Sequence, residues 1–205
     1  MKIKTLLLGN MQTNGYVVSD ENHHCLIIDP GANGKKVVHY LTENELVPEA
    51  VLLTHGHFDH IGAVDYLYEH YHCPIYLHQD DLEMLDNPQL NLSVYENPFT
   101  VKAPVQSSHE EMKFGDFDVQ WLHLPGHCPG SSMIYLKDEN IIFSGDVLFK
   151  GSIGRFDFPN SSKYETIESI NKIKEYYFDA VIYPGHGPNS TLSEERLNNP
   201  YLKKS

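Results

Sequence analysis

Residues Thr54 to His60 read THGHFDH, and this stretch decides how the rest of the chain is organised. It places three imidazoles and one carboxylate in six consecutive positions, on His55, His57, Asp59 and His60. Packing these four groups together without a cation would be costly, because burial removes the water that stabilises their charged forms. Imidazole and carboxylate are ligands that suit zinc, iron or manganese. The stretch therefore predicts a metal site.

The segments on either side of this stretch predict how the ligands are presented. Ala50 to Leu53 is a short apolar run that predicts a buried strand. If the backbone stays extended beyond it, the first two histidines point the same way, since side chains in a strand repeat every two residues. From Ile61 the apolar spacing predicts a helix through Leu67, with the aspartate and the last histidine at its N-terminal entry. The turn would then present two ligand pairs that face different ways.

Three further candidates lie far along the chain, each just beyond a predicted strand and next to a glycine. They are His127, Asp146 and His186, in the sequences Pro-Gly-His, Gly-Asp and Pro-Gly-His-Gly. Loops at strand ends are where a rigid scaffold presents binding groups. Taken singly, each residue is compatible with an ordinary turn. The remaining histidines are interpreted as surface or core residues.

Apolar spacing predicts an alternation of strands and helices along the chain. The predicted strands cover residues 3–8, 15–18, 25–28, 50–53, 74–77, 117–124, 132–136, 141–144 and 180–183. The predicted helices lie around residues 37–41, 61–67 and 81–85, and at 163–177, where Ile167, Ile170 and Ile173 share one face. Thr191 to Glu194 has the pattern of a capping box and predicts a last short helix. Residues 87–108 contain three prolines and predict an irregular segment, either a loop that covers substrate or a surface connection without function.

Residues 1–205 are expected to form one domain, because no Pro/Gly/Ser-rich linker or low-complexity segment divides the chain. The predicted strands and helices fall into two pseudo-repeat halves, about 1–110 and 111–205. Each half reads as a sheet with helices on its outer face. The natural packing is then sheet on sheet between two helical layers, which is an α/β (α+β) architecture.

Composition limits the partners and the compartment. The formal net charge of −13 argues against nucleic acid, which is bound by basic surfaces, and leaves a small molecule as the expected partner. The N-terminal apolar run is too short for a signal peptide or a membrane span, and the three cysteines do not form a disulfide pattern. A cytoplasmic protein that does not associate with a membrane is expected. The oligomeric state is left open.

Taken together, THGHFDH, His127, Asp146 and His186 resemble the ligand series of the metallo-β-lactamase superfamily, and the resemblance covers nearly the whole chain. It implies a four-layer αββα sandwich of two mixed β-sheets with a metal pair at one edge. By that resemblance His55, His57 and His127 would hold the first metal, and Asp59, His60 and His186 the second. Asp146 would bridge the two. Zinc is the expected metal, with iron or manganese as alternatives.

Within this superfamily the chain is most similar to glyoxalase II, the hydroxyacylglutathione hydrolases. The segments that carry the likeness are LPGHCPGSSMIYL (124–136), SGDVLFKGSIGRFDFP (144–159) and YPGHGPNSTLSEERLNNPYL (183–202). The full-length enzymes continue into a helical domain, so the chain is similar to the short, single-domain members. Arg155 matches the position of a basic glutathione contact, with a salt bridge to Asp157 as the competing interpretation. Asp157 stands where a tyrosine is often found in the eukaryotic enzymes.

The resemblance implies a metal-dependent hydrolase that cleaves a thioester such as S-lactoylglutathione, with a metal-bridging hydroxide as nucleophile. A thioester suits this chemistry, because a thiolate leaves without a strong acid. Asp59 is the candidate for orienting the nucleophile, and the alternative is that it binds metal only. The rival hypotheses are an iron-dependent persulfide dioxygenase and a lactonase or β-lactamase of the same superfamily. A binding protein without activity is disfavoured, because all seven ligand positions are present.

Overall fold

The computed structural model of the protein describes residues 1–203. Strands and helices occur in the following order along the chain: β1 (Lys2–Leu8), β2 (Thr13–Ser19), β3 (His24–Ile28), α1 (Gly34–Glu43), β4 (Val47–Leu52), α2 (Phe58–Ile61), α3 (Val64–Tyr71), β5 (Ile75–Leu77), η1 (Gln79–Asp81), α4 (Leu82–Leu85), η2 (Ser93–Tyr95), β6 (Val105–Ser107), β7 (Glu111–Phe114), β8 (Phe117–His123), β9 (Ser132–Leu136), β10 (Ile141–Gly145), β11 (Leu148–Phe149), β12 (Ser152–Ile153), α5 (Lys163–Glu175), β13 (Val181–Pro184), β14 (Ser190–Thr191) and α6 (Leu192–Asn198).

The strands form two mixed six-stranded sheets and one small hairpin. The first sheet has the order β1-β2-β3-β4-β5-β6, antiparallel from β1 to β3 and parallel from β3 to β6. The second has the order β14-β13-β10-β9-β8-β7, in which only β10 and β13 are parallel. Strands β11 and β12 pair separately. The first sheet ends at residue 107 and the second begins at residue 111, while the assignment of all 205 residues to one domain stays a prediction.

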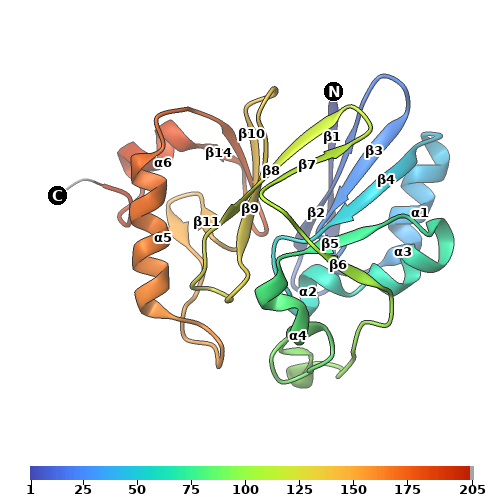
Figure 1. Ribbon diagram of the computed structural model, residues 1–205, viewed down its shortest axis with the longest axis horizontal. Helices are drawn as coiled ribbons and strands as arrows, with labels where there is room; N and C mark the ends of the chain where they lie inside the picture. The colour runs from blue at the N-terminus through green and yellow to red at the C-terminus, as the bar shows by residue number, and fades with distance from the viewer. Residues whose placement is uncertain (204–205) are drawn as a thin grey trace.

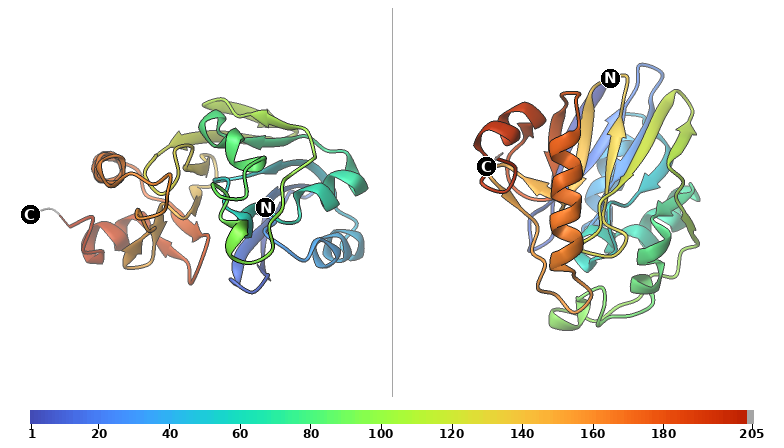
Figure 2. Two further views of the ribbon diagram at one scale, coloured as in Figure 1. Left: turned by 90° about the horizontal axis from the view of Figure 1, so that it is seen from below. Right: turned by 60° about the vertical axis from the view of Figure 1, so that its left-hand side comes forward.

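Three apolar clusters separate four layers, which Figure 1 shows as helix, sheet, sheet and helix from one side to the other. In β3 the side chains alternate between two of these clusters. Cys25 and Ile27 pack toward α1 and α3, whereas Leu26 and Ile28 pack between the sheets. On the other side α5 and α6 cover the second sheet, as the side view in Figure 2 shows. The predicted αββα sandwich of two mixed sheets is confirmed.

One predicted helix is two helices in the structure. The prediction of a helix running on from Ile61 is wrong, because the chain breaks between α2 and α3 at Gly62 and Ala63. The backbone N–H of Ala63 donates to Pro30 O at 2.9 Å instead of continuing the helical ladder. A Cβ on Gly62 would lie 2.3 Å from Gly31 O, so only glycine fits this approach. Asp59 and His60 consequently lie within a short helix of their own.

Several short edge strands were not predicted. Strand β6 lies inside the segment 87–108, which also contains η2, so that segment is less irregular than its prolines indicate. Strands β7 and β14 were missed as well. Edge strands of two to four residues have too few positions for a clear alternation of apolar side chains. In α5, Ile170 and Ile173 are buried as predicted, but Ile167 is 49% exposed, so the predicted face is narrower.

Thr191 caps the start of α6 as the predicted capping box requires, since its side chain accepts a hydrogen bond from Glu194 N at 3.1 Å. The reciprocal bond is not formed, because Glu194 Oε2 accepts from Ser190 Oγ instead. Across residues 1–203, none of the helices has both the length and the apolar character needed to span a membrane.

Candidate metal centre

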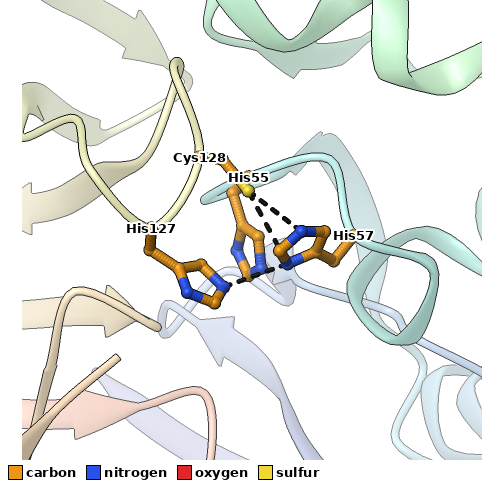
Figure 3. Close-up of side chains that lie close together, drawn as sticks. All are labelled: His55, His57, His127 and Cys128. Atoms are coloured by element: carbon orange, nitrogen blue, oxygen red, sulfur yellow. Dashed lines mark hydrogen bonds between the residues drawn. The ribbon is translucent and has the colours of Figure 1, made fainter. Parts of the chain in front are cut away.

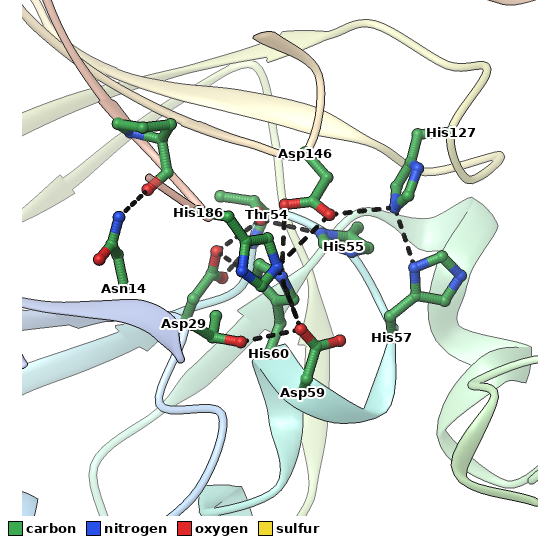
Figure 4. Close-up of polar contacts among 12 residues, drawn as sticks. Asn14, Asp29, Thr54, His55, His57, Asp59, His60, His127, Asp146 and His186 are labelled. Carbon is green, nitrogen blue, oxygen red and sulfur yellow. Dashed lines mark hydrogen bonds and ion pairs between the residues drawn. The ribbon is translucent and has the colours of Figure 1, made fainter. Parts of the chain in front are cut away.

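The candidate ligands come together at one edge of the sandwich, carried by loops from both sheets. Strand β4 leads into the loop with His55 and His57, and α2 carries Asp59 and His60. The remaining three lie after β8, β10 and β13 of the second sheet. Since β10 and β13 are parallel, their C-terminal ends lie at the same edge. The structure thus brings all seven predicted site residues together, as Figure 4 shows.

The first group consists of three histidines (Figure 3). His57 Nδ1 lies 3.0 Å from His127 Nε2, and the His55 ring centroid is 4.8 Å from that of His57. All three side chains are buried. The two neighbouring histidines of the motif converge, as an extended backbone would predict. Strand β4 itself ends at Leu52 and the chain bends at Thr54, but beyond the bend the backbone of His57 is extended (φ −71°, ψ 148°).

The second group consists of Asp59, His60 and His186. His186 Nε2 lies 3.2 Å from Asp59 Oδ2, and His60 Nε2 lies 3.6 Å from the same oxygen. His60 is fully buried, whereas the other two side chains are partly exposed. This group therefore offers two imidazole nitrogens and one carboxylate to a common point.

Asp146 lies between the two groups. Its Oδ2 is 3.5 Å from His127 Nε2 and 3.7 Å from His186 Nε2, and its Oδ1 is 3.4 Å from His60 Nε2. One carboxylate thus faces a member of the first group and two members of the second. This is the geometry that a bridging ligand requires.

A second layer of hydrogen bonds holds these side chains in place (Figure 4). Asp29 Oδ2 accepts from His60 Nδ1 at 2.9 Å, and Thr13 Oγ1 donates to Asp59 Oδ2 at 2.8 Å. His127 Nδ1 donates to Arg155 O at 2.7 Å. Each histidine held in this way keeps its other ring nitrogen free to face the cluster.

Burial and neighbouring charges set the protonation of the cluster. Burial, followed by the neighbouring His127, lowers the pKa of His57 to about 3, and burial also lowers the pKa of His55 and of His127. These imidazoles are neutral at pH 7, which is the form that binds metal. Burial also opposes a charge on His60, but the carboxylates of Asp59, Asp29 and Asp146 outweigh it and raise the pKa of His60. The carboxylates thus draw a positive charge into the centre.

Asp81 links the two sheets beneath the first group. Its buried carboxylate accepts from Gly56 N at 3.0 Å, between two candidate ligands, and from Gly130 N at 2.6 Å, shortly after His127. Burial raises the pKa of Asp81 to about 7, against the effect of the two backbone donors. Asp81 therefore fixes the position of one ligand loop relative to the other.

A cavity of about 590 Å³ lies over the cluster. Five candidate ligands, His57, Asp59, His127, Asp146 and His186, contribute to its wall. Most of the remaining wall is apolar and includes Met11, Phe58, Leu92, Phe149, Ile153 and Phe158. Part of the segment 87–108 lines this cavity through Leu92, Tyr95 and Glu96, so the segment borders the site.

Arg155 also lines the cavity, as expected from the sequence, but its guanidinium is already paired. Its Nε and Nη2 donate to Oδ1 and Oδ2 of Asp157, each at 2.9 Å. The predicted salt bridge between these two residues is therefore present.

Cys128 is buried beside the first group, with its Sγ 3.3 Å from His57 Nε2 (Figure 3). Its Sγ and one ring nitrogen of each of the three histidines all lie within 4.8 Å of one another, so it could share a cation with them. Burial raises the pKa of its thiol, so the thiol is protonated at neutral pH. The thiol thus packs against a candidate ligand.

Several supporting residues could not be singled out from the sequence. Asp29, Thr13 and Asp81 hold ligands or their loops, yet each appears in the sequence as an ordinary strand-end, turn or helix residue. An aspartate directly after an apolar strand was the only signal for Asp29. The apolar wall of the cavity had no signal either, because its members come from separate loops.

The sequence model of the metallo-beta-lactamase superfamily matches residues 8–186. A probable metallo-hydrolase of Bacillus subtilis, YqgX, is 39% identical over 98% of both chains. The hydroxyacylglutathione hydrolase GloC of Haemophilus influenzae is 32% identical, again over 98% of both chains.

Two crystal structures are similar over nearly their whole lengths. The structure of BLEG-1, a B3 metallo-beta-lactamase, has a TM-score of 0.93 at 37% identity and covers 99% of this chain and 100% of its own. The structure of TTHA1623 in a di-iron-bound form has a TM-score of 0.87 at 37% identity and covers 97% of this chain and 100% of its own. Relatives with different described activities thus share this fold.

Proposed function

The chain belongs to the metallo-beta-lactamase superfamily and is a metallo-hydrolase, and from this premise we propose that its site hydrolyses thioesters with two bound divalent cations. The proposal deepens the family assignment in two respects, the number of cations and the bond that is cleaved. Each is supported by a separate observation.

Three buried atoms that have no hydrogen-bond partner among residues 1–203 carry the proposal of a metal centre. They are His55 Nε2, His60 Nε2 and Asp146 Oδ1. Leaving buried polar atoms unpaired costs free energy, and a cluster of them in one place requires a partner. The donors are two imidazole nitrogens and a carboxylate oxygen, which suit a divalent cation. The residues present therefore fit the group that the superfamily implies.

We assign His55, His57 and His127 to one cation and Asp59, His60 and His186 to the other. Asp146 is assigned to both, because its Oδ2 faces His127 of the first group and His186 of the second. When bound, such a pair supplies Lewis acidity and lowers the pKa of water to about 7. Zinc is the proposed metal. Iron is the alternative, in view of the di-iron form of TTHA1623.

The chain's own residues then hold and orient the reactants. Asp59 lines the cavity, and the bond from Thr13 to its Oδ2 leaves Oδ1 to orient an attacking water toward the acyl carbon. We therefore keep Asp59 as the candidate catalytic residue. The cavity of about 590 Å³ has room for an acyl group and part of a thiol.

The choice of a thioester is supported by two points. The chain is 32% identical to the hydroxyacylglutathione hydrolase GloC over 98% of both lengths. A thiol with a pKa of about 8.5 leaves as thiolate near neutral pH, so no general acid beside the leaving group is needed. S-lactoylglutathione is the reference substrate for a test.

The experiment is thiol release from S-lactoylglutathione and from simpler thioesters, with protein reconstituted with zinc, iron or manganese. Activity that is lost in His57→Ala and kept in His109→Ala is expected, since His109 is exposed and outside the cluster. Hydrolysis of a β-lactam or a lactone in place of thioesters would assign the activity described for BLEG-1 or for lactonases instead. Oxygen uptake with a persulfide by the iron form, without thiol release, would make the protein a dioxygenase.

A further inference from the structure

The charges around the cavity are poorly matched to an anionic thiol. Among the lining residues, Arg155 is the only one with a permanent positive charge, and Glu96 adds a negative charge that lies outside the metal cluster. Glu96 is held by a hydrogen bond from Asn10 Nδ2 at 2.9 Å. The chain as a whole carries a formal net charge of −13. Two bound divalent cations would offset this charge at the ligand cluster itself. A carboxylate on the thiol portion, beyond the cluster, would still meet Glu96 and no unpaired cation among the lining residues.

The single cation is already occupied. Asp157 takes two donors of the Arg155 guanidinium in a bidentate pair, and the guanidinium lies 4.6 Å from the centre of the Phe158 ring. The pair uses the Nε and Nη2 donors and leaves those on Nη1, but the Asp157 carboxylate balances the charge of the guanidinium. A substrate carboxylate would therefore meet a neutralised ion pair and not an unpaired cation.

The remaining wall favours apolar groups. Met11 and Leu92 reach the cavity from the first half of the chain, and Phe149, Ile153 and Phe158 reach it from the second. Burying an apolar chain against such side chains is favourable, whereas burying a carboxylate without a partner is costly.

We infer that the cavity selects thioesters whose thiol portion is uncharged, and that Asp157 sets this preference by neutralising the charge of Arg155. Glutathione, with two carboxylates and one ammonium group, is then a poor thiol for this site. The inference rests on the proposed thioester hydrolysis for its choice of ligands. It concerns the cavity wall, however, and is tested by binding alone.

The test uses thioethers that cannot be hydrolysed, S-hexylglutathione and S-hexyl-N-acetylcysteamine, titrated calorimetrically into the metal-loaded protein. Both carry the same hexyl group, so the difference reports on the thiol portion. The neutral thioether is expected to bind at least as tightly as the glutathione thioether, although it has fewer atoms. Tighter binding of S-hexylglutathione than of the neutral thioether would overturn the inference.

Asp157→Asn tests the role assigned to the ion pair. Release of Arg155 should strengthen binding of S-hexylglutathione relative to the neutral thioether by about 2- to 5-fold, the range of an exposed ion pair. Asp118→Asn is the matched control, because it removes an exposed carboxylate paired with Lys113, outside the cavity. An unchanged ratio in Asp157→Asn, or an equal change in the control, would contradict the role of Asp157.

The two proposals fail in distinguishable ways. Binding that follows the expected order without hydrolysis of any thioester would retain the cavity preference and remove the proposed function. Efficient hydrolysis of S-lactoylglutathione together with tighter binding of S-hexylglutathione would retain the proposed function and remove the cavity preference.

Discussion

The Asp29 carboxylate accepts a hydrogen bond from Nδ1 of His60 at 2.9 Å, with both side chains buried. This bond fixes the proton on Nδ1 and turns Nε2 toward the cluster. Asp29 also accepts from Thr54 N and Thr54 Oγ1, at 2.8 and 2.6 Å. One carboxylate thus orients a ligand of α2 and the start of the loop after β4.

Asp29→Asn should weaken the binding of one of the two cations. Asparagine cannot accept with both terminal atoms, so His60 or Thr54 loses its partner, and such a loss costs about 10- to 100-fold in metal affinity. A competitive titration with a chelator measures this. Asp20→Asn, a change in a turn outside the cluster, is the control. Equal affinities in Asp29→Asn and the wild type would contradict the role given to Asp29.

Asp81→Ala should destabilise the fold. The buried N–H groups of Gly56 and Gly130 would each lose an acceptor, at about 1–3 kcal/mol for each unsatisfied donor. The free energy of unfolding from urea titration should fall by about 2–5 kcal/mol in the metal-free protein. Asp81→Asn keeps one acceptor, so its free energy of unfolding should lie between those of the wild type and Asp81→Ala. A loss within about 0.5 kcal/mol, typical of a surface site, would show that Asp81 does not join the loops.

The same residue predicts a dependence of stability on pH. The pKa of Asp81 is about 7 in the fold, above its value of about 3.9 in an unfolded chain. A raised pKa gives stability that is complete at pH below about 4 and is lost as the pH rises to about 7, because the unfolded chain releases its proton first. The free energy of unfolding is measured with chelator present for the wild type and for Asp81→Asn. The value for the wild type minus the value for Asp81→Asn should decrease from pH 5 to pH 8. A difference that stays constant or increases over this range would contradict the assignment.

Gly145→Ala should be more destabilising than Gly151→Ala. Both glycines have positive φ, +48° and +71°, so alanine is strained at each by about 1–2 kcal/mol. Only at Gly145 would the new Cβ clash, at 2.3 Å from Thr54 Oγ1, whereas nothing lies within 4 Å at Gly151. The added clash should cost a further ~1–3 kcal/mol, as overpacking does. Equal losses of unfolding free energy would show that Thr54 moves aside freely.

The architecture was predictable because the central strands have continuous apolar runs, and because residues 54–60 concentrate histidine and aspartate directly after one of these strands. Strand β3 was found from its continuous apolar run, because both of its faces are buried. Helix α5 was found from the spacing of its isoleucines, because it buries one face. The edge strand β6 was missed, because three residues cannot display a period of two. The break at Gly62 depends on the approach of Gly31, which lies far away in the sequence.

The seven residues of the candidate centre could be proposed from short sequence motifs and not from apolar patterns. Each sits in a short motif rich in histidine, aspartate or glycine, and the resemblance supplied their grouping. The supporting residues could not be found in this way. Asp81 acts through backbone groups of Gly56 and Gly130, and a backbone donor has no sequence signal. The pairing of Arg155 with Asp157 was one of two interpretations that the sequence left equal.

Metal stoichiometry tests the central claim most directly. The protein would be freed of metal, loaded with zinc, separated from excess ions and analysed by mass spectrometry, alongside Asp146→Ala. Two cations per chain in the wild type are expected, and fewer in Asp146→Ala, because its carboxylate faces both ligand groups. One cation or none per wild-type chain under saturating conditions would contradict a centre built from all seven residues.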